Sequence, residues 1–390
     1  MKVLQINSVC GIRSTGRICT DIAEVLRQAG HECRVAYGRE TVPQQHKAIS
    51  YRIGTDLSVK LDGMKTRLFD NAGFNSVAAT KRFIKWMKDY DPDIIHLHNI
   101  HGYYINVKLL FEALKEMDKP VVWTLHDCWA FTGHCSHFDR KGCKKWQTGC
   151  HHCYQKKNYP ASLLLDCSRK NYEKKKRLFT GLRDLTVVTP SAWLAELVKQ
   201  SFLGDYPVSV IHNGIDLQNF KPTEGDFRKQ YGLENKKIVL AVSSVWSKNK
   251  GYEDVCRLPQ LLPADYRVVV VGISQEQKGD LPENIIGITR TNNVQQLAEI
   301  YTTADVFVNP TYQDTYPTVN LEAQACGTPV VTYRTGGSVE SVPVAQVVAQ
   351  GDLEALAQKI QEQDLQLAQQ DFSAGAAFNK YLELYNAIMK

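Results

Sequence analysis

The sequence predicts an α/β protein built from two doubly wound parallel sheets. Three observations lead to this prediction. The 390 residues exceed what one hydrophobic core comfortably organises. Short runs rich in valine and isoleucine alternate with stretches of helical periodicity. These runs form two series, separated near the turn Asn213-Gly-Ile-Asp216. Because parallel sheets bind ligands at the carboxyl ends of their strands, we expect two facing units to form a cleft.

The strands follow in order along the chain. Those of the first series cover Val3 to Ile6, Cys33 to Tyr37, Ile94 to Leu97, Val121 to Leu125 and Leu185 to Val188. The second series opens at Val208 and continues through residues 238–242, 268–271, 285–288, 306–308 and 329–332. Apolar spacing from Phe378 to Met389 predicts a terminal helix. We therefore expect a first domain over residues 1–206, a second over 207–370 and a C-terminal segment over 371–390.

Composition narrows the class of protein. Hydrophobic residues make up 43% and charged residues 23% of the chain, as in an ordinary soluble protein. No apolar run is long enough to span a membrane, and the segment Met1 to Asn7 turns polar too soon for a signal peptide. We therefore expect a cytoplasmic protein. The net charge of +6 is modest and favours an anionic substrate or lipid surface over nucleic acid.

The stretch from Asp314 to Glu322 is the most informative. Pro317 stands where a helix start tolerates proline, so one carboxylate lies in a loop ahead of a helix and the second lies inside it. The first-turn amides of Thr318 and Val319 are donors at the positive end of this helix and suit a diphosphate, while carboxylates suit sugar hydroxyls. This is the outline of a nucleotide-sugar site. A solvated helix start is the alternative interpretation.

This stretch resembles the E-x7-E signature of glycosyltransferase family 4, with Asp314 where the first glutamate is more usual. The turn from Asn213 to Asp216 resembles the one that opens the family's second domain. The resemblance implies a retaining enzyme with the GT-B fold, two Rossmann-like domains around a central cleft and a C-terminal helix that crosses back to the first domain. It implies that Asp314 holds the hydroxyls of the transferred sugar, that Glu322 accepts hydrogen bonds from the ribose, and that Tyr316 lies among the donor-binding residues.

A glycine loop, Gly11-Ile-Arg-Ser-Thr-Gly16, follows the first strand and precedes a helix predicted from about Arg17 to Gln28. Glycines let a backbone approach a phosphate closely, although the spacing does not fit G-x-G-x-x-G. In the family this loop lies beside the donor diphosphate, so the resemblance assigns Gly11 and Gly16 to donor binding. A plain tight turn is the alternative.

His126 stands at the carboxyl end of the strand that starts at Val121. The family carries a histidine there in contact with the transferred sugar, and the resemblance therefore assigns His126 a catalytic role. His96 and His98 alternate on one face of the preceding strand. For these two a satisfied core position is the better interpretation, with His98 a possible cleft residue.

The loop from Ser243 to Gly251 matches the one where the family places basic residues against the diphosphate. Lys250 fits the lysine of that motif, which neutralises phosphate oxygens and the leaving group. The family's partner arginine is absent, and Ser244 occupies its approximate place. Gly272 and the loop of residues 291–293 lie where the resemblance places the nucleotide base. Cations that could compensate for the arginine are Arg13, Arg17 and Lys248.

Eleven cysteines are many for a protein whose thiols stay reduced. A C-x2-C pair with two further thiols nearby predicts a structural zinc site at Cys135, Cys143, Cys150 and Cys153. Reduced buried thiols are an equal alternative, and a redox or disulfide role is a third. No catalytic metal is expected, since no D-x-D stands at a strand end.

Two basic segments, residues 81–88 and 168–179, combine lysine and arginine with apolar residues at helical spacing. They predict contact with an anionic membrane surface, and a solvated helix face is the alternative.

We therefore predict a retaining hexosyltransferase that moves a sugar from a UDP- or GDP-sugar to a glycan or lipid-linked glycan in capsule or exopolysaccharide biosynthesis. Peripheral contact with the inner face of the plasma membrane is part of this prediction. By resemblance, the departing phosphate takes the proton of the acceptor. The alternatives are a GT-B nucleotide-sugar epimerase and a nucleotide-sugar-binding module without turnover. A nicotinamide dehydrogenase fits less well because the glycine loop has the wrong spacing.

Overall fold

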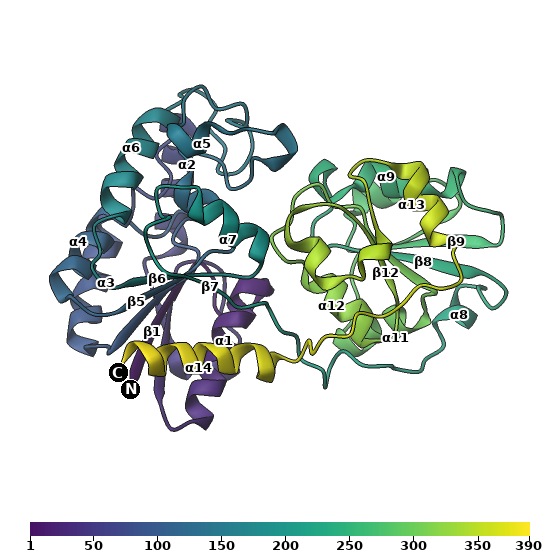
Figure 1. Ribbon diagram of the computed structural model, residues 1–390, viewed down its shortest axis with the longest axis horizontal. Coiled ribbons are helices and arrows are strands. Elements are labelled where there is room, and N and C mark those ends of the chain that lie inside the picture. The colour runs from purple at the N-terminus through teal and green to yellow at the C-terminus, as the bar shows by residue number, and fades with distance from the viewer. The chain divides into compact units, whose positions relative to one another are not determined.

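The computed structural model describes residues 1–390 and divides them into two compact units. The first unit consists of Met1–His212 and Phe378–Lys390, and the second consists of Asn213–Ala377. Each unit is built around its own sheet, and the registers pair its strands in parallel (Figure 1). The predicted fold class of two doubly wound α/β units is confirmed.

The sheet of the first unit has seven strands in the order β3-β2-β1-β4-β5-β6-β7. Its strands are β1 (Lys2–Asn7), β2 (Glu32–Tyr37), β3 (Ser50–Arg52), β4 (Ile94–Leu97), β5 (Val121–Thr124), β6 (Leu185–Thr189) and β7 (Val208–Val210). The helices are α1 (Arg13–Gln28), α2 (Asp56–Phe69), α3 (Val77–Tyr90), α4 (Val107–Met117), α5 (Lys145–Thr148), α6 (Ser168–Phe179) and α7 (Ala192–Lys199). Strand order reverses between β1 and β4, and open parallel sheets bind ligands at such a switch point.

Strand β7 belongs to the first sheet, so the prediction that Val208 opens the second series is wrong. The register pairs Val187 with Val208 and Thr189 with Val210 in parallel. The contact boundary accordingly falls between His212 and Asn213, whereas the sequence placed it between residues 206 and 207. Strand β7 has only three residues, and so short a run does not indicate which sheet it joins.

The sheet of the second unit has six strands in the order β10-β9-β8-β11-β12-β13. Its strands are β8 (Lys237–Val242), β9 (Tyr266–Val271), β10 (Ile285–Ile288), β11 (Val306–Asn309), β12 (Val330–Tyr333) and β13 (Val347–Val348). The helices are α8 (Phe227–Gln230), α9 (Tyr252–Arg257), α10 (Gln275–Gly279), α11 (Val294–Thr303), α12 (Thr318–Ala325) and α13 (Leu353–Ile360).

Successive strand residues of the second unit point to two different cores. Ile238 and Leu240 of β8 belong to one cluster, and Val239 and Ala241 belong to the other. Both faces of the sheet are therefore covered. This burial on both faces explains why the strands read as continuous valine and isoleucine runs rather than as alternating ones.

The terminal helix α14 (Ala374–Ile388, yellow in Figure 1) contributes its residues from Phe378 onward to the first unit. The hydroxyl of Tyr381 lies 3.1 Å from Thr124 Oγ1, and that of Tyr385 lies 2.6 Å from His96 Nδ1. The apolar spacing seen in the sequence therefore marks the face that packs on strands β4 and β5. None of the helices is both long and apolar enough to cross a bilayer.

Candidate functional site

Lys250 and Asp314 form the charged centre of the site in the second unit. Lys250 Nζ lies 2.5 Å from Asp314 Oδ2 and donates to the carbonyl of Gln313 at 3.4 Å. The backbone N–H of Tyr316 donates to the other carboxylate oxygen at 3.3 Å. The lysine side chain is 36% exposed and the aspartate side chain 16%, so the pair lies at the surface of the unit. The structure thus brings together two residues that the sequence predicted separately.

Two loops hold this pair in place. Lys250 ends the short 3₁₀ turn Lys248–Lys250, and Gly251 follows with φ of 74°. A Cβ at Gly251 would stand 2.1 Å from the carbonyl oxygen of Pro310, so only glycine allows this approach. The backbone N–H of Tyr312 donates to Asn249 O at 2.8 Å. These contacts join the loop after β8 to the loop after β11.

Helix α12 begins four residues after Asp314. Pro317 is its N-cap, with φ of −71° and ψ of 116°, and not its first helical residue as predicted. Thr318 and Val319 occupy the first turn and are half-buried. Helix geometry gives their N–H groups no acceptor within the helix, so they carry the partial positive charge of this end. A carboxylate and helix amides therefore follow one another along one segment of the unit, and the Lys250 ammonium from another loop lies beside the carboxylate.

Glu322 and Tyr316, on either side of the first turn of α12, are both buried. Glu322 is 6% exposed, and its Oε2 accepts a hydrogen bond from the hydroxyl of Tyr301 at 3.0 Å. One of its two oxygens is therefore engaged inside the unit. The ring of Tyr316 is 3% exposed and packs in the core, and burial raises the pKa of its hydroxyl. The membership of Tyr316 in the donor-binding set stays a prediction, and it concerns the backbone of this segment rather than the buried ring.

Gly272 and Ser244 mark the ends of β9 and β8. Gly272 has φ of +89°, and a Cβ there would stand 1.8 Å from the carbonyl oxygen of Ser243. The two strand ends can therefore approach only with glycine at this position. Ser244 is exposed in the following loop. Lys248, one candidate for the missing cation, pairs with Glu253 at 2.8 Å.

Gln313 was missed by the sequence analysis. It is 7% exposed, and its Nε2 has no hydrogen-bond partner within the protein. Its own carbonyl oxygen accepts from Lys250, which places it beside the charged pair. A buried amide donor without a partner is costly, so this group calls for a polar partner that the protein itself does not supply.

His126 is the candidate residue in the first unit, and it lies two residues beyond the end of β5. Its Nε2 is 3.1 Å from Nδ1 of His98, which is 2% exposed. Burial lowers the pKa of His126 to about 4 and that of His98 well below its usual value of 6.5. Both imidazoles are therefore neutral near pH 7. The sequence placed His98 in the core or in the cleft, and the structure joins it to the candidate site.

Asp127 adds a second chain of polar groups that the sequence analysis did not assign. Its Oδ2 lies 2.9 Å from His101 Nε2, and His101 Nδ1 lies 3.1 Å from the hydroxyl of Tyr159. Burial alone would raise the pKa of Asp127, but the neighbouring His101 lowers it to about 2. Asp127 is therefore a carboxylate at neutral pH. Its position directly after His126 was the only signal in the sequence.

The glycine loop of the first unit closes on itself. Gly11 has φ of 70°, and its N–H donates to the carbonyl oxygen of Gly16 at 2.9 Å. Helix α1 begins at Arg13, so the predicted start near Arg17 is wrong and Gly16 lies in the first turn. A Cβ at Gly16 would stand 3.1 Å from Val9 Cγ2 and 3.2 Å from Gly11 N, so a larger residue there would require the neighbouring atoms to shift. Arg13, another candidate for the missing cation, pairs with Glu40 at 2.8 Å.

The four cysteines predicted to hold zinc do not form a metal site in this structure. No group of three or more histidine, cysteine or acidic side chains is arranged to bind a metal ion. Cys135 and Cys153 are hydrogen-bonded to each other, which lowers the pKa of Cys153 and raises that of Cys135. Cys143, Cys150 and Cys153 are half-buried against the core of the first unit, and all eleven thiols are free. The arrangement fits the alternative of reduced, largely buried thiols.

The basic segments differ from the prediction at Lys175. This residue is 1% exposed, and its ammonium donates to Trp129 O at 2.7 Å and to Thr132 O at 3.1 Å. It also lies 3.4 Å from the centroid of the Trp129 ring. Burial lowers the pKa of Lys175 to about 7. Lys175 therefore supports the core, whereas Lys170, Lys176 and Arg177 of the same segment are exposed.

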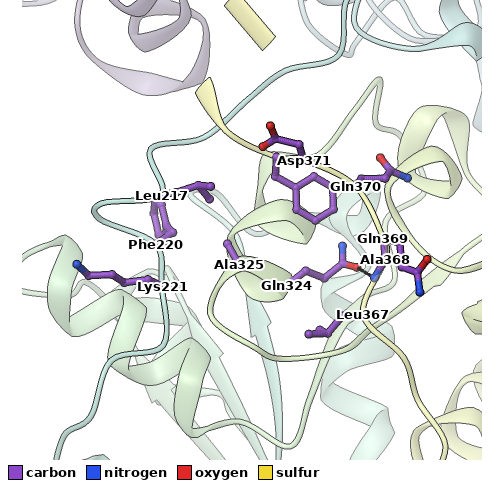
Figure 2. A pocket seen from close by; sticks show the side chains of 11 residues that line it. Leu217, Phe220, Lys221, Gln324, Ala325, Leu367, Ala368, Gln369, Gln370 and Asp371 are labelled. Carbon is purple, nitrogen blue, oxygen red and sulfur yellow. Dashed lines mark hydrogen bonds between the residues drawn. The ribbon is translucent and has the colours of Figure 1, made fainter. Parts of the chain in front are cut away.

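A surface cavity of about 580 Å³ lies elsewhere in the second unit (Figure 2). Its lining includes Gln324 and Ala325 at the C-terminal end of α12, together with Phe220 and Phe372. The side-chain oxygen of Gln324 accepts from the backbone N–H of Ala368 at 2.8 Å. The amides predicted to bind a diphosphate lie at the opposite end of α12, so this cavity is separate from the candidate donor site.

Two family models match the chain. The model described as "Glycosyltransferase Family 4" matches residues 15–219, and that described as "Glycosyl transferases group 1" matches residues 236–363. The glycosyl transferase WcaC of Escherichia coli K12, named for colanic acid biosynthesis, is 24% identical over 354 residues, which is 87% of this chain and 85% of that protein. A D-inositol 3-phosphate glycosyltransferase of Mycobacterium sp. (strain JLS) is 30% identical over 151 residues, 35% of this chain and 33% of that protein.

Solved structures share the fold over the full chain. Sucrose-phosphate synthase from Thermosynechococcus elongatus superposes with a TM-score of 0.69 at 16% identity and covers 100% of this chain and 99% of its own. Anabaena Alr3699/HepE, solved in complex with UDP-glucose, gives a TM-score of 0.67 at 16% identity and covers 99% and 100%. The family 4 model alone spans more than half of the 390 residues. The chain therefore belongs to glycosyltransferase family 4 and is a glycosyltransferase with the GT-B fold.

Proposed function

We propose that this glycosyltransferase moves a hexose-type sugar from a UDP-sugar to a lipid-linked polysaccharide intermediate, with retention of configuration at the anomeric carbon. The pair formed by Lys250 and Asp314 beside the first turn of α12 carries this proposal. The relative WcaC, named for colanic acid biosynthesis, supports a role in polysaccharide biosynthesis. The complex of HepE with UDP-glucose supports a UDP-sugar, and a GDP-sugar is the other donor class.

The chemistry follows from the charges that develop during transfer. The bond between the anomeric carbon and the diphosphate oxygen breaks, which leaves positive charge on the sugar ring and negative charge on the diphosphate. Lys250 and the amides of Thr318 and Val319 stabilise this negative charge, and Asp314 binds hydroxyls of the sugar. In the resting protein Lys250 already has one anionic partner, Asp314. When the donor binds, its diphosphate becomes the second anionic partner of Lys250.

No side chain near Asp314 is placed as an evident covalent nucleophile. The proposal is therefore attack by the acceptor oxygen from the face that the diphosphate leaves. The new bond joins the acceptor oxygen to the anomeric carbon, and the proton of the acceptor moves to the departing phosphate oxygen. The family resemblance assigns His126 of the first unit a contact with the transferred sugar, and this role stays a prediction.

A panel of nucleotide sugars tested by thermal shift identifies the donor, because a ligand that binds the folded state stabilises it by about 2.7 kcal/mol at 100 times its Kd. We expect one nucleotide class to raise the melting temperature of the wild-type protein. The variant K250M should lose most of this shift, whereas K248M should keep it. No shift with any donor, or equal shifts in both variants, would contradict the proposed site. Product formed only when an acceptor glycan is added then identifies the transfer.

We also propose that the first unit contacts anionic lipid through α2. Leu57, Leu61 and Met64 lie on one face of this helix and are 67%, 45% and 53% exposed. Lys60 and Lys65 are exposed on the same helix. Exposed apolar side chains flanked by lysine are the composition of a helix that lies in a membrane interface.

A second exposed apolar segment extends this surface. Leu163, Leu164 and Leu165 are 64%, 65% and 47% exposed. The backbone N–H of Leu163 donates to Arg67 O at 2.7 Å, which joins the segment to the C-terminal turn of α2. It is separate from the surface predicted from residues 168–179, where Lys175 is buried and which stays a prediction.

Flotation with vesicles that contain phosphatidylserine tests the lipid surface. We expect the wild-type protein to float and the triple variant L57S/L61S/M64S to remain with the free protein. The variant V344S is the matched control, because Val344 is 80% exposed in the second unit and its loss should leave flotation unchanged. Equal flotation of the triple variant and the wild type would overturn the assignment.

A further inference from the structure

Arg39 and Arg67 of the first unit carry charges that no acidic side chain pairs with. Neither guanidinium has an ion pair or a hydrogen-bond partner within the protein. Arg39 is half-buried in the loop after β2, and Arg67 is exposed near the end of α2. By contrast, Arg13 and Arg52 are each paired with a carboxylate. Arg39 and Arg67 therefore keep their N–H donors for a partner outside the chain.

The loop that carries Arg39 is held by its neighbours. The backbone N–H groups of Gly38 and Arg39 donate to Ser8 O at 3.2 and 2.8 Å. Gly102 has φ of +108°, and a Cβ there would stand 3.7 Å from both Cδ and Nη1 of Arg39. The guanidinium carbon lies 5.9 Å from the centroid of the Tyr103 ring. Arg39 therefore lies against the loop that follows β4.

Tyr103 contacts both Arg39 and helix α2. A Cβ at Gly63 of α2 would stand 3.5 Å from Cδ2 of the Tyr103 ring. Arg67 is four residues after Gly63, so it lies on the same face of the helix, one turn further along. Burial raises the pKa of the Tyr103 hydroxyl, whereas the charges of Arg39 and Arg67 lower it. Both guanidinium groups are therefore close to one hydroxyl, which has no hydrogen-bond partner within the protein.

One acidic group, Asp62, also acts on the Tyr103 hydroxyl and raises its pKa. Asp62 is 2% exposed, and its two oxygens accept hydrogen bonds from Asn75 at 3.0 Å and from Ser76 at 2.5 Å. Its carboxyl group is therefore engaged inside the unit. The two arginines remain open to an anion.

The exposed apolar face of α2 borders the two arginines. Met64 precedes Arg67 by three residues, so their side chains are neighbours on the helix surface. Met64 is 53% exposed, and Leu57 and Leu61 continue this face along the helix. The hydrogen bond from Leu163 N to Arg67 O brings the exposed leucines 163–165 to the same end of α2. Cationic side chains beside an exposed apolar face suit a ligand that joins an anionic group to a lipid chain.

We propose that Arg39, Arg67 and the hydroxyl of Tyr103 bind the phosphate or diphosphate group that links the acceptor glycan to its lipid. The two guanidinium groups donate to the phosphate oxygens, and the apolar face of α2 contacts the first carbons of the lipid chain. Arg39 and Tyr103 both follow carboxyl ends of parallel strands, where such sheets bind ligands. The inference rests on the proposed transfer to a lipid-linked acceptor. It adds the residues and the chemical group by which this acceptor is recognised.

Binding of decyl diphosphate tests the inference, because this probe carries a diphosphate and an alkyl chain without a glycan. The titration is made with UDP at saturation, so that the donor site is occupied. We expect the wild-type protein to bind the probe in isothermal titration calorimetry, and to bind decanol more weakly. R39Q and R67Q should each weaken binding of the probe by ~10-fold or more, because each removes charge-assisted hydrogen bonds to phosphate.

R257Q is the matched control and should bind the probe like the wild type, because Arg257 is exposed at the end of α9 in the second unit. Retained binding of UDP by each variant checks that it is folded. Equal binding of the probe by R39Q, R67Q and the wild type would overturn the proposal. So would a wild-type protein that does not bind the probe.

Flotation with phosphatidylserine vesicles distinguishes the acceptor group from a phospholipid headgroup. The double variant R39Q/R67Q should still float, because the apolar face of α2 is intact, although it no longer binds the probe. A double variant that binds the probe normally but does not float would assign the arginines to the headgroup and overturn the proposal. Probe binding that depends on both arginines, in a protein without transfer activity, would refute the proposed function alone.

Discussion

Replacing Lys250 by methionine separates the catalytic from the structural role of the charged pair. The pair is partly exposed, so its loss should lower the free energy of unfolding by only ~0.2–1 kcal/mol. Asp314 keeps its hydrogen bond from the Tyr316 N–H in the variant. Removing one preorganised group that stabilises developing negative charge costs ~2.7–4 kcal/mol of transition-state stabilisation. That energy corresponds to a loss of ~100- to 1,000-fold in kcat, since 1.36 kcal/mol is tenfold in rate.

The assay is release of nucleoside diphosphate under saturating donor, together with urea unfolding of the same samples. K248M is the control, because Lys248 is two residues away, is 74% exposed and pairs with Glu253. It should keep both the rate and the stability of the wild type. A K250M rate within threefold of the wild type, or an equal loss of rate in K248M and K250M, would rule out this role of Lys250.

Two further predictions concern stability. The variant G272A should be destabilised by more than ~1 kcal/mol, because φ of Gly272 is +89° and a Cβ there would stand 1.8 Å from Ser243 O. The control is G279A, which should unfold like the wild type because a Cβ at Gly279 meets nothing within 4 Å. The second prediction concerns His134, whose Nδ1 lies 2.5 Å from Asp70 Oδ1. Burial lowers the pKa of His134, but the hydrogen bond and the charge of Asp70 raise it, and the net result is a pKa above 6.5. Its contribution to stability is therefore complete below about pH 6.5 and is lost as pH rises through the folded-state pKa. Urea unfolding should show H134Q losing more stability relative to the wild type near pH 6 than near pH 9, and an equal loss at both would contradict this.

The fold could be predicted because its strands are buried on both faces. Val239 and Val268 lie against one core, and Leu240 and Val269 lie against the other, so neither kind of position tolerates polar residues. Strands β3, β7 and β13 have two or three residues, and a run of that length leaves no pattern. Their place in a sheet depends on contacts with distant segments, which a local pattern does not record.

The sequence predicted only part of the site, because the burial of its residues depends on contacts with distant segments. The chemistry of Lys250 and Asp314 is visible in the residue types and in the turn and helix around them. Burial is not visible there, so the sequence did not show that the side chains of Tyr316 and Lys175 are buried. Tyr316 follows Asp314 in the sequence, yet its ring packs in the core, and Lys175 stands in a run of lysines, yet it bonds to backbone carbonyls.

The link between His98 and His126 also depends on tertiary structure. The two residues lie 28 positions apart, at the ends of the neighbouring strands β4 and β5. Their hydrogen bond arises from the parallel register that pairs Leu97 with Trp123. Sequence reasoning could place each histidine at a strand end, but the pairing of the strands was needed to make them one unit.

The position of the bond that breaks in the donor shows whether the sugar is transferred as proposed. Slow turnover of the donor in H₂¹⁸O, without an acceptor, should place ¹⁸O on the anomeric carbon of the released sugar and none on the nucleoside diphosphate. ¹H NMR of the first product should show the anomeric configuration of the donor. Label on the phosphate, or a sugar of inverted configuration, would contradict a retaining transfer supported by Lys250 and Asp314.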